Sequence, residues 1–379
     1  MEDDDIKGRV REGVALCLSG GGYRAMLFHA GALWRLNELR FLRKLNRISS
    51  VSGGSITAGL LGIRWRELDF DEAGFARNLQ EKVIEPLRCM AVRTVDWRAV
   101  IGAAFSGERV ADRVAKAYDK YLYQGATLQD LPDDESGPRF VINATNVQSG
   151  VLWRFMRPYM RDYRVGEIRS PNLLVAVAVA ASSAFPPILS PSILKLDEAQ
   201  YTPDSGFDLQ RKPFTTSPVL TDGGVYDNLG LQPAWSFRTV LVSDGGGKTG
   251  AVERPRNDWV SHSVRVLSVI DNQVRSLRKR WLIAAYKSPQ NSGSSHRDGA
   301  YWGIRTDIRD YQLNDTLPCP HDLTMRLAAI PTRLASLDRA TQDRLINWGY
   351  AVCDAAMRKY VVPNADPPEG FPYPRYGVG

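Results

Sequence analysis

The order of apolar and polar positions along the chain predicts an alternation of strands and helices. Short, nearly continuous apolar runs are typical of strands covered on both faces, and longer segments with apolar residues at helical spacing are typical of helices. The short runs predict strands at residues 14–18, 47–51, 139–143, 151–156, 219–220, 239–242 and 264–270. The longer segments predict helices at residues 25–39, 56–63, 173–183 and 338–359, and one more that Asp271 caps. Because strand and helix alternate from the start, we expect a parallel sheet with helices on both faces.

The region 64–137 departs from this alternation. Charged residues interleave there with aromatic side chains at roughly helical spacing. We expect a helical insertion that caps the functional site together with the loop at 187–216. The other boundaries predicted are a flexible acidic N-terminal tail at 1–11, a single domain at 12–362, a mobile polar loop at 290–299 and a Pro-rich extended tail at 363–379.

Two strand-to-helix turns in the first sixty residues carry the candidate chemistry. The first turn contains Gly20, Gly21 and Gly22, and such a turn aims several backbone N–H groups at one point beside the positive end of a helix. The second places Ser52 between a strand and a helix, where a tight turn exposes a serine for attack. An anion hole next to a nucleophile indicates acyl transfer by a serine hydrolase.

Nucleotide binding is the main alternative for the glycine turn. Gly20, Gly22 and Ala25 fit the spacing of a dinucleotide fingerprint. That motif needs an acidic residue at the end of the second strand to bind the ribose, and residues 49–52 contain none. The chain also lacks the GxxxxGK[ST] pattern of a P-loop. An oxyanion hole is therefore the favoured interpretation.

The base that activates Ser52 is the second open question. None of the four histidines has a convincing triad setting, and a structural or surface role is expected for each: His29, His262, His296 and His321. A buried carboxylate can act as the base when its pKa is raised. Asp222 follows a strand and precedes Gly223 and Gly224, which leave room for a substrate. Asp244 also follows a strand and precedes glycines, but we favour Asp222.

Charge and cysteine content indicate the cellular compartment and the surfaces that the protein contacts. The 379 residues carry a net charge of +7, a bias toward anionic surfaces such as phospholipid headgroups. The four cysteines are far apart and show no CxxC spacing, which is typical of a reduced, intracellular protein. The apolar run 173–181 is too short to span a bilayer. We expect a cytoplasmic protein with peripheral contact at the inner face of the membrane.

Four blocks of the chain resemble the patatin-like phospholipase family. They are Gly20–Arg24, Ser50–Gly54, Ala181–Pro187 and Asp222–Gly224, and the resemblance spans about residues 12–275. Ser50 departs from the family pattern GxSxG, which has glycine at that position. The resemblance implies a three-layer α/β/α fold, with Ser52 as nucleophile and Asp222 as base. It also implies an oxyanion hole at Gly20, Gly21, Gly22 and Gly53, with support from Arg24, Gly54, Gly223 and Gly224. Arg24 is expected to orient the glycine turn or to meet a lipid phosphate. No metal and no cofactor are required by this scheme.

The sequence therefore predicts a serine lipid acyl hydrolase that cleaves acyl esters of glycerophospholipids. A soluble esterase or thioesterase, and a catalytically silent membrane- or ligand-binding protein of the same fold, stay open as alternatives. A further hypothesis is a bacterial effector whose activity is gated by a small-molecule activator. The basic segment 275–280 is a candidate contact for anionic lipid. We expect no nucleic-acid polymer as a partner, and the oligomeric state is not predicted.

Overall fold

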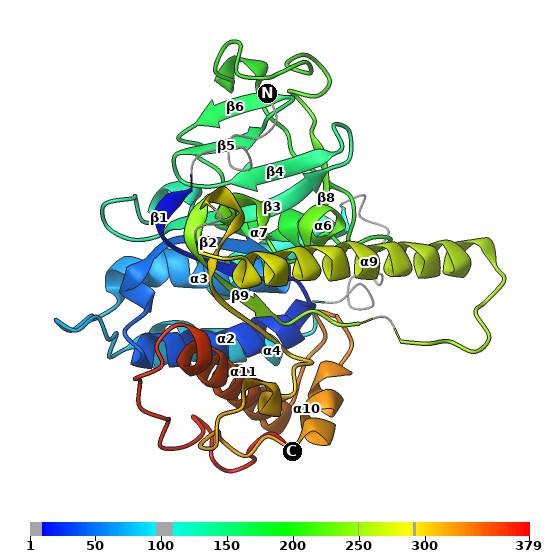
Figure 1. The fold of residues 1–379 in the computed structure, drawn as a ribbon. Helices are drawn as coiled ribbons and strands as arrows, with labels where there is room; N and C mark the ends of the chain where they lie inside the picture. Colours follow the sequence, from blue (N-terminus) through cyan, green and yellow to red (C-terminus); the bar gives the residue numbers. More distant parts are fainter. Residues whose placement is uncertain (1–9, 96–108, 249, 291–292) are drawn as a thin grey trace.

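The computed structural model describes residues 10–95, 109–248, 250–290 and 293–379, and its centre is a mixed sheet (Figure 1). The strands are β1 (Arg11–Leu18), β2 (Leu45–Val51), β3 (Arg139–Asn146), β4 (Val151–Phe155), β5 (Tyr159–Asp162), β6 (Gly166–Arg169), β7 (Ser192–Ile193), β8 (Val219–Asp222), β9 (Phe237–Asp244) and β10 (Asp298–Gly303). The main order is β10-β9-β1-β2-β3-β4-β5-β6, and β8 pairs with both β3 and β7. Neighbours from β10 to β3 are parallel, and those from β3 to β6 are antiparallel.

The α-helices of the described residues flank this sheet. They are α2 (Gly22–Glu38), α3 (Gly53–Arg64), α4 (Glu85–Ala91), α6 (Val110–Tyr118), α7 (Val175–Ser182), α8 (Gly224–Asp227), α9 (Trp259–Lys287), α10 (His321–Ala328) and α11 (Arg339–Tyr360). The predicted three-layer α/β/α sandwich with a mainly parallel core is confirmed. No helix among the described residues is both long and apolar enough to cross a bilayer.

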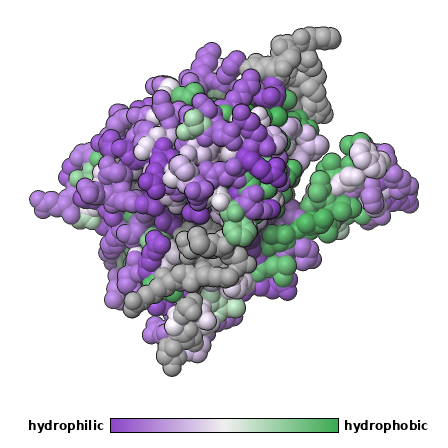
Figure 2. Space-filling view, turned by 90° about the horizontal axis from the view of Figure 1, so that it is seen from above, coloured by the Kyte–Doolittle hydropathy of each residue, from purple (hydrophilic) through white to green (hydrophobic). Residues whose placement is uncertain are grey.

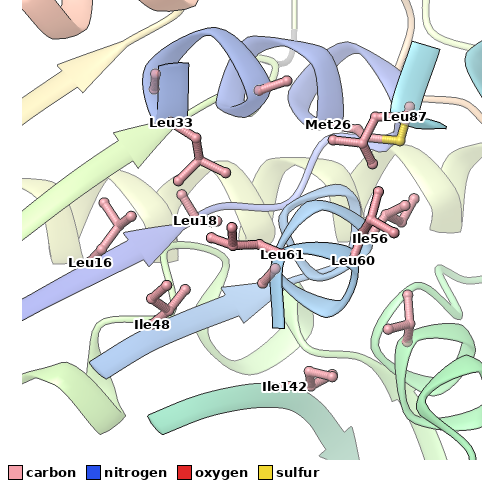
Figure 3. Packing of buried hydrophobic residues seen from close by; sticks show 14 of the residues in the cluster. Leu16, Leu18, Met26, Leu33, Ile48, Ile56, Leu60, Leu61, Leu87 and Ile142 are labelled. Carbon is pink, nitrogen blue, oxygen red and sulfur yellow. The ribbon is translucent and has the colours of Figure 1, made fainter. Parts of the chain in front are cut away.

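Strand β1 shows how the two faces of the sheet are filled. Its side chains alternate between faces, as in any strand. Leu16 and Leu18 belong to the large apolar cluster that includes α2 and α3 (Figure 3). Ala15 and Cys17 belong to a smaller cluster on the opposite face, which Leu282 of α9 closes. The continuous apolar run of β1 thus reflects burial on both sides.

Helices α2 and α11 pack unusually closely because glycine is present on both of them. A Cβ atom on Gly31 would be 1.9 Å from the carbonyl oxygen of Ile346, and one on Gly349 would be 1.9 Å from that of Phe28. Such distances exclude any side chain at either position. The C-terminal helix therefore lies directly against the helix that follows the glycine turn.

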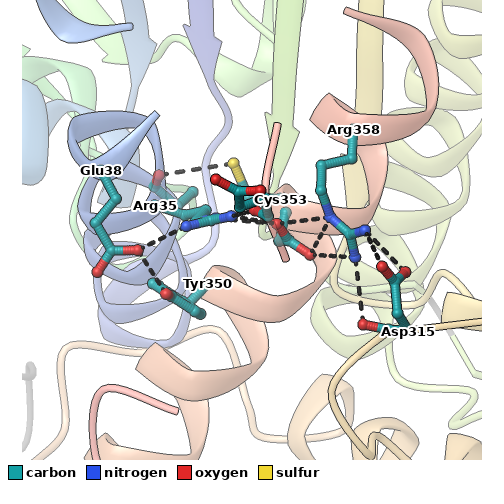
Figure 4. Close-up of polar contacts among 9 residues, drawn as sticks. Arg35, Glu38, Asp315, Tyr350, Cys353 and Arg358 are labelled. Atoms are coloured by element: carbon teal, nitrogen blue, oxygen red, sulfur yellow. Dashed lines mark hydrogen bonds and ion pairs between the residues drawn. The ribbon is translucent and has the colours of Figure 1, made fainter. Parts of the chain in front are cut away.

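A buried ion network joins the same two helices (Figure 4). Asp354 is 1% exposed and accepts hydrogen bonds from Arg35 at 2.9 Å and from Arg358 at 2.9–3.1 Å. Arg358 also binds Asp315, whose side chain is 52% exposed, at 2.8 Å. Two guanidinium groups thus share one carboxylate that is shielded from water.

The prediction from the sequence was wrong for one central element. Residues 264–270, predicted as a strand, lie inside α9, and Asp271 lies in the middle of that helix instead of capping it. Asp258 is the capping residue, since its carboxylate accepts the N–H of Ser261 at 2.9 Å. A run of β-branched side chains imitates a strand over this short window, although the spacing of the whole segment is helical.

The predicted tails and loops differ from the structure in two places. Residues 363–379 do not extend away but fold back on α11, where the Asn347 side chain donates to the carbonyls of Tyr373 and Gly377 at 2.7 Å. The predicted mobile loop 290–299 overlaps β10, and His296 is held by the carbonyl of Ser288 at 2.7 Å. Residues 1–9 of the predicted N-terminal tail lie outside the described residues, and β1 begins at Arg11.

The region 64–137 is largely helical where it is described. It contains α4, α6 and two π-helical turns at Gln80–Ile84 and Asp119–Tyr123. These helices pack against α2, α3 and α7. Residues 96–108 lie outside the described residues, and the role of this region as a cap stays a prediction.

Candidate active site

The two glycine-containing turns meet at one edge of the sheet. β1 and β2 are parallel neighbours, so their carboxyl ends lie side by side. Ser52 has φ 50° and ψ −118°, a backbone conformation that non-glycine residues rarely adopt. Its N–H donates to Oγ of Ser182 at 2.9 Å, and the N–H of Gly54 donates to the carbonyl of Ser19 at 3.1 Å. These bonds hold the strained turn that a serine nucleophile requires.

Close backbone contact explains the two glycines after Ser52. A Cβ on Gly53 would be 2.2 Å from the carbonyl oxygen of Gly22, and one on Gly54 would be 2.3 Å from that of Leu18. Both turns would have to separate to admit any side chain. The glycines therefore allow the two turns to touch.

The N–H groups of the two turns differ in their availability. Gly20 donates to the carbonyl of Asn228 at 3.2 Å, so its N–H is already used. Within the described residues, the N–H groups of Gly21, Gly22 and Gly53 have no hydrogen-bond acceptor. Gly21 and Gly22 stand at the start of α2, and Gly53 starts α3. Unpaired donors at helix starts form an anion-binding position.

Asp222 is positioned beside Ser52 at the end of β8. It is 2% exposed, it lines the same cleft as Ser52, and its Oδ1 accepts the N–H of Gly224 at 2.7 Å. Burial raises the pKa of Asp222 to about 7, although the Gly224 N–H and the nearby Ser52 side chain act in the opposite direction. The structure thus brings both predicted side chains to one cleft, and their roles as nucleophile and base stay a prediction.

Ser182 is a positioning residue for which the sequence analysis assigned no role. Its Oγ accepts the Ser52 N–H, donates to the carbonyl of Asn143 at 2.6 Å and contacts Ser55 Oγ at 2.9 Å. Its own carbonyl accepts the N–H of Gly223 at 3.2 Å. One residue of α7 therefore ties both candidate turns together. The Ala181–Pro187 block was the available signal, but it did not reveal which atoms Ser182 binds.

Ser50 replaces the upstream glycine of the GxSxG pattern without a steric conflict. Its hydroxyl donates to the carbonyl of Val141 at 3.3 Å and accepts from Ser55 at 3.1 Å. The additional hydroxyl is thus hydrogen-bonded below the turn.

The other candidates for the base, Asp244 and His29, are engaged in other contacts. Asp244 accepts from Arg275 at 2.8 Å and from the Tyr301 hydroxyl at 2.7 Å, and Arg275 holds the pKa of this buried carboxyl below its usual range. His29 is fully buried and uses both ring nitrogens, on Ser243 Oγ and the Ser19 carbonyl. Burial lowers the pKa of His29 to about 4. A salt-bridged carboxylate and a buried neutral imidazole both fit structural roles.

Arg24 connects the glycine turn to distant parts of the chain. Its guanidinium donates to the carbonyl of Gly245 at 3.1 Å, to the carbonyl of Ile330 and to Thr332 Oγ1 at 2.9 Å. It is 2% exposed, and burial lowers its pKa to about 10. Of the two roles expected for Arg24, these contacts favour orientation of the turn.

A cleft of about 540 Å³ opens above Ser52 and Asp222. Its walls come from the glycine turn, Phe185, the loop after β9, the inner face of α9 and residues 328–332. The described residues of 64–137 and 187–216, which the sequence predicted as the cap, do not line it. The loop after β9, α9 and residues 328–332 are the parts of the site that sequence analysis missed.

Comparisons with known proteins agree with this architecture. The sequence model described as patatin-like phospholipase matches residues 16–235, which include both turns and Asp222. The chain therefore belongs to the patatin-like phospholipase family. No curated protein sequence matches the chain significantly.

Two solved structures share the fold at low sequence identity. Human GIVD cytosolic phospholipase A2 aligns with a TM-score of 0.56 and 12% identity over 95% of this chain and 62% of that one. The same human protein in complex with methyl gamma-linolenyl fluorophosphonate and terbium chloride aligns with a TM-score of 0.54 and 14% identity, over 95% and 59% of the chains. This chain thus spans less than two thirds of the length of those human chains.

Proposed function

We propose that this protein is a serine lipid acyl hydrolase of the phospholipase A type. The observation that carries the proposal is that the strained Ser52 and the buried Asp222 line one cleft, beside N–H donors that have no acceptor among the described residues. Membership of the patatin-like phospholipase family and the fold shared with a human cytosolic phospholipase A2 support a lipid ester as substrate.

The geometry supports a two-step reaction. Ser52 Oγ attacks the ester carbonyl carbon while its proton passes to the Asp222 carboxylate, and the N–H groups of Gly21, Gly22 and Gly53 stabilise the resulting oxyanion. The carbon–oxygen ester bond then breaks, and the leaving alkoxide takes the proton from Asp222. Water repeats the sequence on the acyl-enzyme: Asp222 takes one proton from water, the acyl–Ser52 bond breaks, and Ser52 recovers the proton as the fatty acid leaves.

Fatty acid release from vesicles of phosphatidylcholine and phosphatidylglycerol tests this proposal. We expect mass spectrometry to detect release by the wild type and by Ser217→Ala, an exposed serine outside the cleft. Ser52→Ala is expected to lower the rate by about 10³-fold or more. A fluorophosphonate probe should label the wild type and not Ser52→Ala.

The alternatives give different results in the same experiment. Hydrolysis of short soluble esters with no action on vesicles would indicate an esterase or thioesterase. A labelled Ser52 without hydrolysis of either substrate would indicate gating by an activator. Absence of both labelling and hydrolysis would contradict the proposal and favour a binding protein of the same fold.

The pKa of Asp222 predicts a pH profile. The base must be ionised to accept the Ser52 proton, and burial raises its pKa to about 7. We therefore expect kcat/KM on a soluble ester to be constant above roughly pH 8 and to fall about tenfold per unit below roughly pH 6. A profile that stays flat down to pH 5 would show that Asp222 is not the titrating base.

A further inference from the structure

Helix α9 projects from the body of the protein. Its 29 residues give it a length of about 43 Å at 1.5 Å per residue. Only Leu282 and Ala285, near its C-terminal end, are buried. The N-terminal half extends past the sheet and the other helices (Figure 1). Tertiary packing therefore leaves most of the helix surface available.

The exposed face of α9 is apolar. It carries Trp259, Val260, Val266, Leu267, Val269, Ile270, Leu277 and Trp281, with exposed fractions between 42% and 82%. Leu267, Ile270, Leu277 and Trp281 recur at spacings that put them on one side of a helix. Figure 2 shows hydrophobic side chains along the projecting arm. We refer to the eight residues as the α9 stripe.

The opposite face of α9 is fixed to the body by its arginines. Arg275 binds Asp244 at 2.8 Å, and Arg278 lies 3.5 Å from Asp227 and donates to the carbonyl of Tyr226. Arg275 and Arg278 of the predicted lipid contact 275–280 thus bind the body of the protein, whereas Arg280 is exposed. The two inward arginines help to fix the rotation of the helix.

Charge around the α9 stripe favours an anionic partner. Between residues 259 and 287, Asp271 is the single acidic residue, and it lines the cleft. Arg280 and Lys287 are exposed, and Arg265 is partly exposed. A second copy of the chain would bring these cations together, whereas an anionic lipid surface would neutralise them.

The helix that carries the α9 stripe also lines the candidate active site. Ser268 and Asp271 of the same helix line the cleft that contains Ser52. Phe185, 43% exposed, lines the cleft, and Val225, 46% exposed, follows its Gly224. Phe185 and Val225 thus place exposed apolar side chains at or beside the cleft that α9 helps to line.

We propose that the α9 stripe is a docking surface for anionic phospholipid bilayers, on which α9 lies in the interfacial plane and brings the Ser52 cleft to the lipid. The proposal extends the function proposed above by naming the surface through which the substrate is reached. An amphipathic helix with basic residues and an exposed tryptophan, Trp259, at the outer end of its apolar face is suited to this position, while Trp281 at the inner end stacks on Trp235.

Vesicle flotation tests the proposal with Ser52→Ala protein, so that the lipid stays intact. We expect the protein to bind vesicles of equal parts phosphatidylcholine and phosphatidylglycerol. Vesicles of phosphatidylcholine alone should bind about tenfold more weakly, and 0.5 M salt should weaken binding to the mixed vesicles by a similar factor, because both changes reduce charge attraction. Adding Leu267→Gln, Ile270→Gln and Leu277→Gln should lower the partition coefficient by about tenfold or more. The matched control adds Val147→Gln and Phe207→Gln, which are exposed apolar residues elsewhere, and should bind within about twofold of the parent.

Activity measurements separate this proposal from the proposed function. With Ser52 intact, the triple α9 variant should lose vesicle hydrolysis and retain hydrolysis of a soluble short-chain ester. Stripe-dependent binding by a protein that neither hydrolyses an ester nor reacts with the fluorophosphonate probe would uphold the docking surface and refute the function. Equal binding by the triple variant and its parent would overturn the docking surface. A wild-type dimer in analytical ultracentrifugation that becomes a monomer in the triple variant would also overturn the proposal, because a second copy of the chain would then cover the α9 stripe.

Discussion

Asp222→Asn should lower kcat by about 10³–10⁴-fold while leaving the protein folded. The amide cannot accept the Ser52 proton, although it can still accept the N–H of Gly224. Burial raises the pKa of Asp222 to about 7, above that of an unfolded aspartate, so folding stability is lost as pH rises from about 4 through about 7. The neutral amide removes this penalty. At pH 8 the thermal midpoint of Asp222→Asn should equal or exceed that of the wild type.

Asp244→Asn provides the matched control, because Asp244 also follows a strand and precedes glycine. It is 1% exposed and pairs with the buried Arg275, whose charge would lose its partner. We expect a lower thermal midpoint with a loss in kcat of less than about tenfold. The opposite pattern, with activity lost at Asp244 and retained at Asp222, would exchange the roles of the two carboxylates.

Asp354→Ala should destabilise the fold by about 3–5 kcal/mol. The substitution leaves Arg35 and Arg358 buried without the carboxylate that they share, and the carboxylate itself is 1% exposed. We expect the thermal midpoint to fall by roughly 4–6 °C, as measured by differential scanning calorimetry.

Asp315→Ala tests whether burial causes this effect. Asp315 contacts the same Arg358, but its side chain is 52% exposed. Its loss should cost no more than about 1 kcal/mol, because water replaces an exposed partner at little cost. If Asp354→Ala and Asp315→Ala lowered the thermal midpoint equally, the carboxylate of Asp354 would not be shielded from water as its contacts indicate.

The sequence predicted the centre of the fold and the candidate dyad because their signals are local. The apolar run of β1 and the two glycines that follow Ser52 are short patterns with a direct physical meaning. Asp222 was favoured for a similar reason, as a carboxylate between a strand and two glycines. Parallel pairing of β1 and β2 brings the two turns together at one sheet edge, and antiparallel pairing of β8 with β3 brings Asp222 to them.

Elements that depend on distant partners were missed. β10 is a short edge strand with two glycines, and it forms by pairing with β9, where a Cβ on Gly299 would be 1.9 Å from the Val240 carbonyl oxygen. Ser182 lies 130 residues from Ser52 along the chain. Arg24 binds residues more than three hundred positions away. No short sequence pattern contains such contacts.

The region matched by the family is not a unit that could be moved between genes. The match ends at residue 235, but β9, which pairs with β1 from the other side, begins at Phe237. Gly349 of α11 lies against Phe28 of the helix that begins at Gly22. A chain cut after the match would expose an open edge at β1 and an uncovered face on α2. Gene fusion or recombination at that boundary should therefore yield insoluble products, because the last third of the chain covers the elements that hold the glycine turn.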